Sequence, residues 1–359
     1  MKTVFDICVL PGDGIGIEVI EATLPILERI QRGAGFELRF THKPAGALHY
    51  KATGTALPEA TFEAAQRADG ILFGAMGWPE IRYPDGTEIA PQLDLRFRLE
   101  LYAGVRPARA IPGVPQALAD PRAKDIDLVL LRESTEGLFA SRGKGVVEGD
   151  REARDTMVIT RAGSQRVHEF AFRLAERRKL RGKPGSVTCV DKANVFVSMA
   201  FFRKVFDEVA ARHPGVIANH HYVDATALDL VRKPWMFDVM VTENMFGDIL
   251  SDQAAALVGG MGMAPSADVG DAHGLFQPCH GSAPDICGQG KANPTAAILS
   301  AAMMLDWLAD RSGNEALAQA AGKLERAVDA VFAPGRMRPF ELGGKDGTAA
   351  IRDAVLSNL

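Results

Sequence analysis

Few cysteines and no long hydrophobic run characterise this sequence of 359 residues. Its 4 cysteines form no C-x-x-C pair and no zinc-ligand spacing, which excludes a zinc-finger module. Scattered thiols in a chain of this size are typical of reduced cytosolic proteins. No segment approaches the roughly 18 consecutive apolar residues of a membrane span, and the first apolar run is too short for a signal peptide. The composition therefore predicts a cytoplasmic protein with no membrane partner.

A basic excess and two nucleotide-binding motifs are also missing. The net charge of −4 argues against nucleic acid as a partner, because such domains usually carry excess positive charge. The Arg-rich residues 161–183 keep an apolar stripe at helical spacing, which indicates a solvated helix face. No P-loop G-K-[ST] occurs, and the glycines at 12, 14 and 16 do not form G-x-G-x-x-G. A P-loop NTPase and a Rossmann domain are not expected.

Short apolar runs alternate with helical patterns along the chain. The runs that predict buried strands are residues 4–10, 71–75, 126–131, 187–190 and 237–242. The segments that predict helices are residues 17–30, 57–68, 164–180, 195–212, 295–309 and 315–332. Residues 132–149 are expected to form a loop or protruding arm, and residues 272–294, rich in Gly and Pro, a loop. The alternation predicts an α/β fold with a mixed, mostly parallel central sheet covered by helices.

Two aspartates share one helix face within residues 237–260. An apolar strand run is followed by a polar turn at residues 243–244 and then by helical spacing. Asp248 and Asp252 lie four residues apart, so their carboxylates stack with no Lys or Arg between them. Hard oxygen ligands suit a divalent cation, whereas the alternative is a pair of solvated surface aspartates. The position at a strand–turn–helix corner favours the metal site.

Several cationic side chains also fall at predicted element ends. Arg96, Arg106 and Arg132 together could form bidentate contacts with a substrate that carries two carboxylates. Lys192 follows a strand in an apolar stretch, a setting in which lysine can act as a general base. Asp224 precedes a helix and is either a third metal ligand or the N-cap of that helix.

Seven motifs follow one another in order along the chain. They are LPGDGIG at 10–16, LDLRFRLELYAGVRP at 93–107, LRESTEG at 131–137, VDKANV at 190–195, YVDA at 222–225, NMFGDILSD at 244–252 and HGSAPDICGQGKANPTAA at 280–297. Together they resemble the metal-dependent β-decarboxylating dehydrogenases of 2-hydroxy acids, the isocitrate/3-isopropylmalate dehydrogenase family. Its members act on 3-isopropylmalate, isocitrate, homoisocitrate, and tartrate or D-malate. The resemblance spans the whole chain and implies that family's two-domain fold, which is not the Rossmann fold.

The resemblance implies a homodimer with shared active sites. Asp248 and Asp252 are expected to bind Mg²⁺ or Mn²⁺ together with Asp224 of the other subunit, and the ion acts as a Lewis acid. Lys192 of that other subunit is expected to take the proton of the substrate hydroxyl. The remaining substrate contacts implied by position are Arg96, Arg106, Arg132, Gln92, Leu93 and Asn194.

NAD is the cofactor that the resemblance implies. The residues that match the family's adenosine-binding positions are Ile15, His280, Gly281, Ser282, Ala283, Pro284, Asp285, Ile286 and Asn293. A carboxylate at Asp285 accepts hydrogen bonds from ribose hydroxyls and repels a 2′-phosphate, which favours NAD over NADP.

One position departs from the family pattern. The family usually has a tyrosine two residues after the glycine of R-E-x-T-x-G, where it protonates the enolate. This chain has Phe139 there, which carries no exchangeable proton. Two hypotheses follow: water or Ser141 replaces the missing acid, or the true substrate does not need an efficient decarboxylation cycle.

The substrate is expected to be a 2-hydroxy diacid of the malate type. Specificity in the family depends on residues just before Arg96, here 87–93, where Ile89 and Leu93 suit a short apolar group at C3. These residues rank 3-isopropylmalate or another 3-alkylmalate first. Gln92, with the segments 77–79 and 106–115, leaves D-malate or tartrate as the second choice, and isocitrate is third.

The domains are expected to interleave. Residues 1–101 with 259–359 form a discontinuous cofactor-binding domain, and residues 102–258 carry the dimer interface, the arm, Lys192 and Asp224. The alternative to an enzyme is a non-catalytic relative of the family with a regulatory function. The intact Lys192, Asp224, Asp248 and Asp252 oppose that alternative, and Phe139 favours it.

Overall fold

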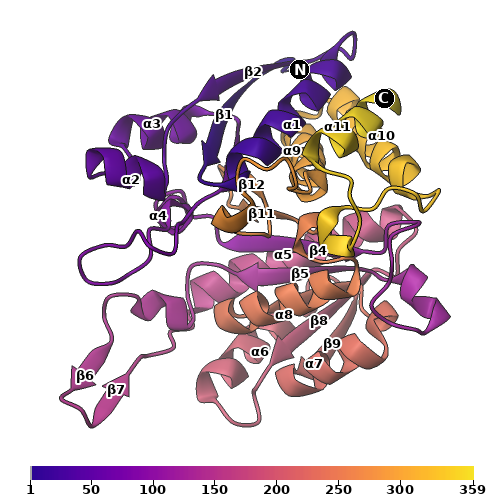
Figure 1. Ribbon diagram of the computed structural model, residues 1–359. Helices are drawn as coiled ribbons and strands as arrows, with labels where there is room; N and C mark the ends of the chain where they lie inside the picture. Colours follow the sequence, from indigo (N-terminus) through magenta and orange to yellow (C-terminus); the bar gives the residue numbers. More distant parts are fainter. Residues whose placement is uncertain (1) are drawn as a thin grey trace. The chain divides into compact units, whose positions relative to one another are not determined.

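The computed structural model describes residues 2–359, which divide into two compact units (Figure 1). Unit 1 contains Met1–Glu100, Ile111–Pro115 and Val258–Leu359. Unit 2 contains Leu101–Ala110 and Gln116–Leu257. Among the described residues, no helix combines the length and the hydrophobicity needed to cross a lipid bilayer.

Unit 1 has a mixed sheet in the order β2-β1-β3-β12-β11. The strands are β1 (Val4–Gly12), β2 (Glu37–His42), β3 (Gly70–Ala75), β11 (Pro265–Val269) and β12 (Gly274–Pro278). All neighbours pair in parallel except β11 and β12. The helices are α1 (Ile15–Gln31), α2 (Ala47–Thr53), α3 (Glu59–Arg67), α4 (Pro91–Arg98), α9 (Thr295–Ser312), α10 (Glu315–Phe332) and α11 (Thr348–Ser357). Of these, α1 and α9 pack directly on the strands.

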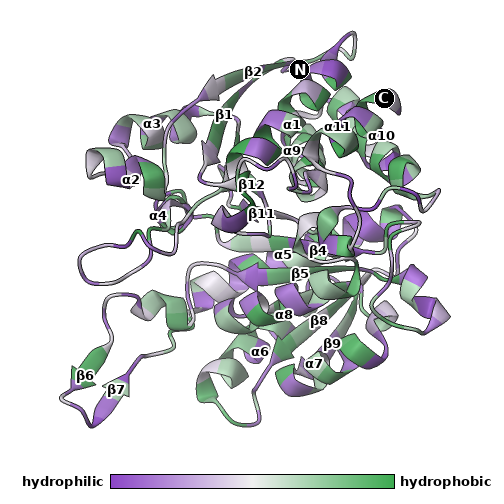
Figure 2. Cartoon of the chain, viewed as in Figure 1, coloured by the Kyte–Doolittle hydropathy of each residue, from purple (hydrophilic) through white to green (hydrophobic). Residues whose placement is uncertain are grey.

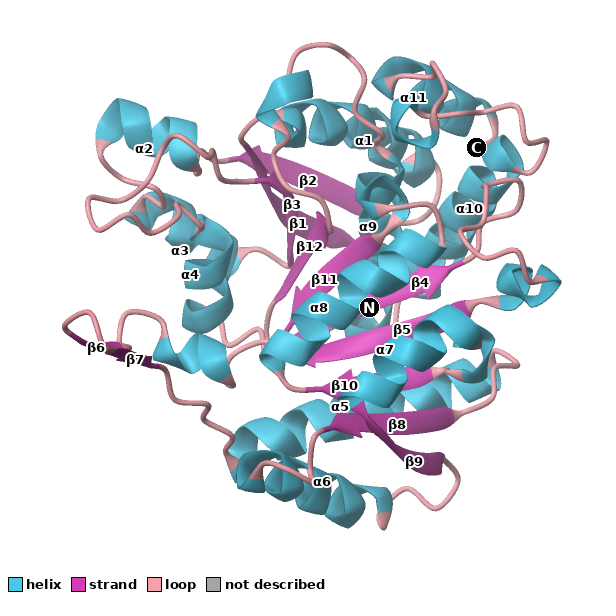
Figure 3. Ribbon diagram, turned by 60° about the horizontal axis from the view of Figure 1, so that its bottom comes forward, coloured by secondary structure: helices cyan, strands magenta, loops and turns pink. Residues whose placement is uncertain are grey.

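Unit 2 has the strand order β4-β5-β10-β8-β9. The strands are β4 (Ala103–Arg109), β5 (Asp127–Glu133), β8 (Ser186–Asp191), β9 (Ile217–Tyr222) and β10 (Val239–Thr242). Only β4 runs antiparallel to its neighbour. Two helix pairs pack on the sheet, α5 (Arg161–Leu180) with α6 (Val197–Ala210) and α7 (Val223–Arg232) with α8 (Asn244–Leu257) (Figure 3). The predicted α/β fold with mostly parallel strands is confirmed.

A short hairpin forms an arm on unit 2. Strands β6 (Val146–Glu148) and β7 (Glu152–Arg154) pair antiparallel and are fully exposed. Figure 2 shows β6 as hydrophobic and β7 as mainly hydrophilic. The predicted protruding arm therefore exists, with its hairpin at residues 146–154.

Chain direction places chemistry-bearing residues at one edge of the unit 2 sheet. Strands β5, β10, β8 and β9 are parallel, so their carboxyl ends meet at the same edge. Glu133 ends β5, Asp191 ends β8, Tyr222 ends β9, and Glu243 follows β10. This edge delivers Lys192, Asp224 and the N-terminus of α8.

The loop predicted over residues 272–294 is wrong for Gly274–Pro278, which form the buried strand β12. Its only polar side chain, Gln277, donates an amide hydrogen bond to Asp268 Oδ2 at 2.9 Å. That partner makes a polar residue tolerable inside the sheet, and no local pattern signals it. The predicted turn at residues 243–244 is also too long, since α8 begins at Asn244.

A buried histidine holds α5 against α6. His168 is 0 % exposed and packs edge-on against the rings of Phe202 and Phe206. Its Nε2 donates to the carbonyl oxygen of Phe202 at 3.2 Å, and its Nδ1 has no partner among residues 2–359. Burial lowers the pKa of His168 to about 3. The imidazole is therefore neutral in the folded protein over the whole physiological range.

We expect His168 to make the protein less stable in acid. The unfolded chain binds a proton near pH 6.5, and the folded chain does so only near pH 3. Stability therefore falls with decreasing pH in that window, by about 1.4 kcal/mol per pH unit for this one group, and is unaffected above it. Urea unfolding of His168→Leu between pH 4 and 7 should show a slope smaller by about one proton. His220→Gln, at an exposed histidine, is the control, and an equal slope in all three proteins would refute the assignment.

Candidate active site

The two aspartates on α8 do share one face. The side chain of Asp248 is half exposed, and Asp252 lies one turn further along the helix. Burial and the negative charge of Asp248 raise the pKa of Asp252. The positive charges of Arg106 and Arg132 act in the opposite direction but do not cancel this rise. Two carboxylates that repel each other beside an open surface fit a divalent cation with oxygen ligands.

No third His, Cys, Asp or Glu side chain joins Asp248 and Asp252 within residues 2–359. Among the described residues, no three His, Cys, Asp or Glu side chains gather into a metal-binding group. Asp224 is directed to Lys192 rather than to the α8 carboxylates. A divalent cation held by Asp248 and Asp252 would therefore need a further ligand.

Arg132 is the centre of the polar contacts around α8. Its guanidinium is buried, donates from Nε to Asn244 Oδ1 at 2.8 Å, and pairs with Asp248. The ring of Phe139, in the 3₁₀ turn Leu138–Ser141, lies 4.9 Å from Arg132 Cζ. Asn244 in turn donates to the carbonyl oxygen of Glu136 at 3.0 Å. Arg132, α8 and Phe139 therefore form one contiguous group.

Close packing fixes α8 against β5. A Cβ added to Gly247 would lie 2.7 Å from Arg132 Cβ, so only glycine allows this approach. The helix is capped by Glu243, whose carboxylate accepts hydrogen bonds from the backbone N–H of Phe246 at 2.6 Å and of Met245 at 3.1 Å. Burial raises the pKa of Glu243. The capped helix presents Asp248 and Asp252 in a defined orientation.

Lys192 and Asp224 form an ion pair at the carboxyl edge. Lys192 Nζ lies 2.5 Å from Asp224 Oδ1. The pair arises from strand register, because Asp191 and Tyr222 are partners in β8 and β9. Lys192 holds the pKa of Asp224 below its ordinary value, and backbone N–H groups at the start of α7 add to the effect. The apolar neighbourhood predicted for Lys192 is thus replaced by an ion pair, while the exposed Asn194 follows in the next turn.

Arg96 lies in unit 1, on α4. It is 4 % exposed and donates from Nη2 to Asp268 Oδ2 at 3.1 Å. Its Nε is buried and has no partner among residues 2–359. The same is true of Gln92 Oε1, one helical turn earlier on α4. A buried donor and a buried acceptor on one helix face remain available to a polar ligand.

Only part of the predicted specificity segment, residues 87–93, lies on the face of α4 that carries Gln92 and Arg96. Ile89 is fully buried in a cluster with Ala47 and Ala56, packed against Trp78. Its proposed contact with the substrate is therefore not supported, because the cluster occupies its whole surface. Leu93 and Gln92 remain half-buried on α4.

Hydrogen bonds connect the two glycine-rich motifs of unit 1, LPGDGIG at 10–16 and the segment that begins at His280. The backbone N–H of Ile15 donates to the carbonyl oxygen of Ser282 at 2.8 Å, and Ser282 Oγ donates to that of Gly77 at 2.5 Å. A Cβ on Gly14, which has a φ of 56°, would lie 2.1 Å from Ser282 O. Ala283 and Ile286 pack on the core around Ile15. The structure thus brings Ile15 and the 280–286 loop together.

Within this loop, His280 and Asp285 differ in environment. Burial lowers the pKa of His280, whose Nδ1 contacts the carbonyl oxygen of Gly281. Asp285 is the middle residue of the turn Pro284–Ile286 and is exposed. Its carboxylate has no hydrogen bond or ion pair within residues 2–359. An exposed carboxylate at a tight turn can accept hydrogen bonds from a polyol.

Two residues of this site, Glu341 and Asp13, were not singled out from the sequence. Asn293 donates from Nδ2 to Glu341 Oε1 at 2.7 Å, and burial raises the pKa of Glu341. Asp13 is buried and accepts backbone hydrogen bonds from Ala47, Leu48 and Gly77. The position of Asp13 inside the LPGDGIG motif could have indicated a structural role from the sequence. No sequence pattern indicates the contact between Glu341 and Asn293.

Comparison with known proteins agrees with this arrangement. The family model for isocitrate/isopropylmalate dehydrogenase matches residues 6–355. The 3-isopropylmalate/3-methylmalate dehydrogenase of Methanocaldococcus jannaschii is 45% identical, over 97% of each chain. A 3-isopropylmalate dehydrogenase of Moorella thermoacetica is 43% identical over 93% of this chain and 92% of its own length. The crystal structure of isocitrate dehydrogenase from Methylococcus capsulatus has a TM-score of 0.86 at 35% identity, over 99% of both chains. The chain therefore belongs to the isocitrate/isopropylmalate dehydrogenase family and is a hydroxy-acid oxidative decarboxylating dehydrogenase.

Proposed function

We propose that the protein is an NAD- and divalent-metal-dependent dehydrogenase of a 3-alkylmalate, with 3-isopropylmalate as the leading substrate. The observation that carries this proposal is the group formed by Asp248, Asp252 and Arg132 on α8 and β5. The relative from Methanocaldococcus jannaschii, whose name joins 3-isopropylmalate and 3-methylmalate, supports a substrate with a small alkyl group. Leu93 offers an apolar contact for that group.

In this proposal, different residues of the chain bind the substrate, hold the metal ion and transfer the proton. Arg96, Arg106 and Arg132 bind the substrate carboxylates, for which planar guanidinium groups are well shaped. Asp248 and Asp252 hold Mg²⁺ or Mn²⁺, which when bound polarises the hydroxyl oxygen. Lys192, paired with Asp224, would take the hydroxyl proton, and a nicotinamide bound at the site would accept the hydride. Asn194 follows Lys192 closely enough in sequence to contact the same substrate.

A second copy of the chain completes the site in this proposal. The helices α7 and α8 pack together (Figure 3), and each exposes apolar side chains on its surface. Leu228, Val231 and Ile249 are 54%, 53% and 62% exposed. Large apolar side chains left exposed on two packed helices suit a protein interface. A homodimer through this surface brings Asp224 and Lys192 of one subunit to the α8 carboxylates of the other.

The cofactor preference depends on Asp285. Replacing Asp285 by Asn keeps the shape and removes the charge that repels a 2′-phosphate. We expect the ratio of kcat/KM for NAD to that for NADP to fall by about tenfold, or roughly 1.4 kcal/mol. Initial rates with both cofactors measure it, and Asp271→Asn, an exposed aspartate elsewhere in unit 1, is the matched control. An unchanged ratio would remove Asp285 from cofactor selection.

Phe139 leaves the reprotonation step without its usual acid. Ser141 does not replace it, because its hydroxyl donates to the carbonyl oxygen of Thr156 at 2.6 Å and accepts from that residue's N–H. Water is then the proton source. Phe139→Tyr is expected to raise kcat by about tenfold, since a positioned acid contributes at least that much. Stopped-flow NADH and CO₂ measurements check it, with Phe139→Leu as control. An unchanged rate and CO₂ yield would show that this position does not shape the reaction.

A substrate panel tests the proposed function. Initial NADH formation with Mn²⁺ is compared for 3-isopropylmalate, 3-methylmalate, D-malate, the tartrates and isocitrate, with CO₂ measured in parallel. The proposal expects a 3-alkylmalate to give the highest kcat/KM with one CO₂ per NADH. Preference for D-malate or tartrate is the second candidate outcome, favoured by Gln92 on α4, whose buried Oε1 has no hydrogen-bond partner within residues 2–359. No turnover of any diacid would support a non-catalytic relative.

A further inference from the structure

Arg203, on α6, touches both strand ends that carry the proposed proton-transfer pair. Its Nε and Nη2 donate to the two carboxylate oxygens of Asp191, each at 2.7 Å. Its Cζ lies 5.1 Å from the ring centroid of Tyr222. Asp191 immediately precedes Lys192, and Tyr222 lies two residues before Asp224. One guanidinium therefore contacts the last residues of β8 and β9.

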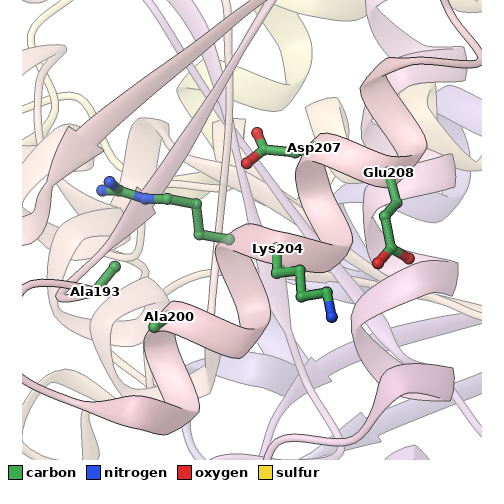
Figure 4. A pocket seen from close by; sticks show the side chains of 6 residues that line it. Ala193, Ala200, Lys204, Asp207 and Glu208 are labelled. Carbon is green, nitrogen blue, oxygen red and sulfur yellow. The ribbon is translucent and has the colours of Figure 1, made fainter.

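The contacts leave the backbone around Lys192 little freedom. Asp191 is 0 % exposed, and its Oδ1 also accepts a hydrogen bond from the N–H of Ala193 at 2.8 Å. The chain is thus held on both sides of Lys192. Figure 4 shows Ala193 beside the N-terminal half of α6, where Ala200 lies. The pKa of Arg203 is raised, first by its hydrogen bond to Asp191 and then by the charge of that carboxylate.

We infer that Arg203 is a positioning residue that fixes the Lys192–Asp224 pair by anchoring the ends of both β8 and β9. This inference rests on the proposed function, in which Lys192 and Asp224 act in proton transfer. Without Arg203 the buried carboxylate of Asp191 has no counterion and must turn towards solvent or bind a proton. Either change moves the backbone of Lys192. A shift of about 1 Å in a catalytic group can cost about 100-fold in rate.

Two variants separate positioning from folding. Arg203→Lys keeps the charge but cannot form both hydrogen bonds to Asp191. The double variant Arg203→Met with Asp191→Asn removes the guanidinium without leaving a buried unpaired charge. Both are expected to fold, judged by circular dichroism, and to lose kcat by about 100-fold while the KM for substrate changes by less than about threefold. Loss of folded protein in both, or an unchanged kcat, would overturn the inference.

A double-mutant cycle with Lys192→Met distinguishes a positioning role of Arg203 from a purely structural one. In the Lys192→Met background, loss of Arg203 should lower kcat by no more than about threefold, because the group that it positions is absent. Equal losses in both backgrounds would contradict positioning. The acetylation rate of Lys192, followed by mass spectrometry, should also rise several-fold in the double variant. If Lys192→Met kept its kcat, the proposed function would fail, whereas an unchanged acetylation rate would overturn the role of Arg203 alone.

Discussion

Replacing Asp252 by Asn is expected to lower kcat/KM by about a thousandfold, equivalent to about 4 kcal/mol of lost transition-state stabilisation. The substitution keeps the side-chain shape and removes one of the two negative charges on the α8 face. The raised pKa of Asp252 reflects its burial and the charge of Asp248, and a bound divalent cation relieves this repulsion. The variant should also bind Mn²⁺ at least tenfold more weakly, measured by calorimetry.

The control for this prediction is Asp353→Asn. Asp353 is an exposed aspartate on α11 that pairs with its neighbour Arg352, far in sequence from the proposed site. Its replacement should leave both activity and Mn²⁺ affinity unchanged. If Asp252→Asn retained wild-type kcat/KM, or if the wild-type enzyme remained active in excess chelator, the α8 face would not be a metal site.

Lys192→Met is expected to lower kcat by a factor of about 10² to 10⁴, the range of general acid–base catalysis. Methionine keeps most of the side-chain length and removes the ammonium that contacts Asp224 at 2.5 Å. The KM for substrate should change little, because the arginines proposed to bind the carboxylates are intact. Lys204→Met, on the exposed face of α6 in Figure 4, is the matched control. A normal kcat in Lys192→Met would remove this residue from proton transfer.

Mixing the two inactive variants tests whether the active site is shared between subunits. In a mixed dimer of Lys192→Met and Asp252→Asn, one site receives both wild-type residues and the other receives neither. Random reassociation should then restore about a quarter of the wild-type activity, since half of the dimers are mixed and each has one intact site. If each subunit forms its own site, the mixture stays as inactive as its components.

Local patterns were sufficient for the apolar strands and for the α8 carboxylates. The runs ending in Ala75, Leu131 and Val190 became β3, β5 and β8 because short runs of mainly apolar and β-branched residues suit strands buried on both faces. The i, i+4 spacing of Asp248 and Asp252 identified a shared helix face directly.

Strands with polar or charged residues were harder to predict. β9 reads IANHHY and is mostly exposed, and β4 contains Arg106 and Pro107, so neither has an apolar strand pattern. The same limit applies to the site. Arg203 lies 12 residues after Asp191, and only the packing of α6 on β8 and β9 brings their side chains together. Glu341 reaches Asn293 across 48 residues.

The pairing of β8 with β9 restricts where the chain can change length. Asp191 faces Tyr222 across the two strands, so the separation of Lys192 and Asp224 is determined by how the strands align. An insertion inside either strand shifts this alignment by one residue and reverses which side chains face the core. The connection at residues 211–216 lies outside both strands and α6, so insertions there leave the alignment intact. Evolutionary insertions and deletions in this part of the protein should therefore be confined to that connection.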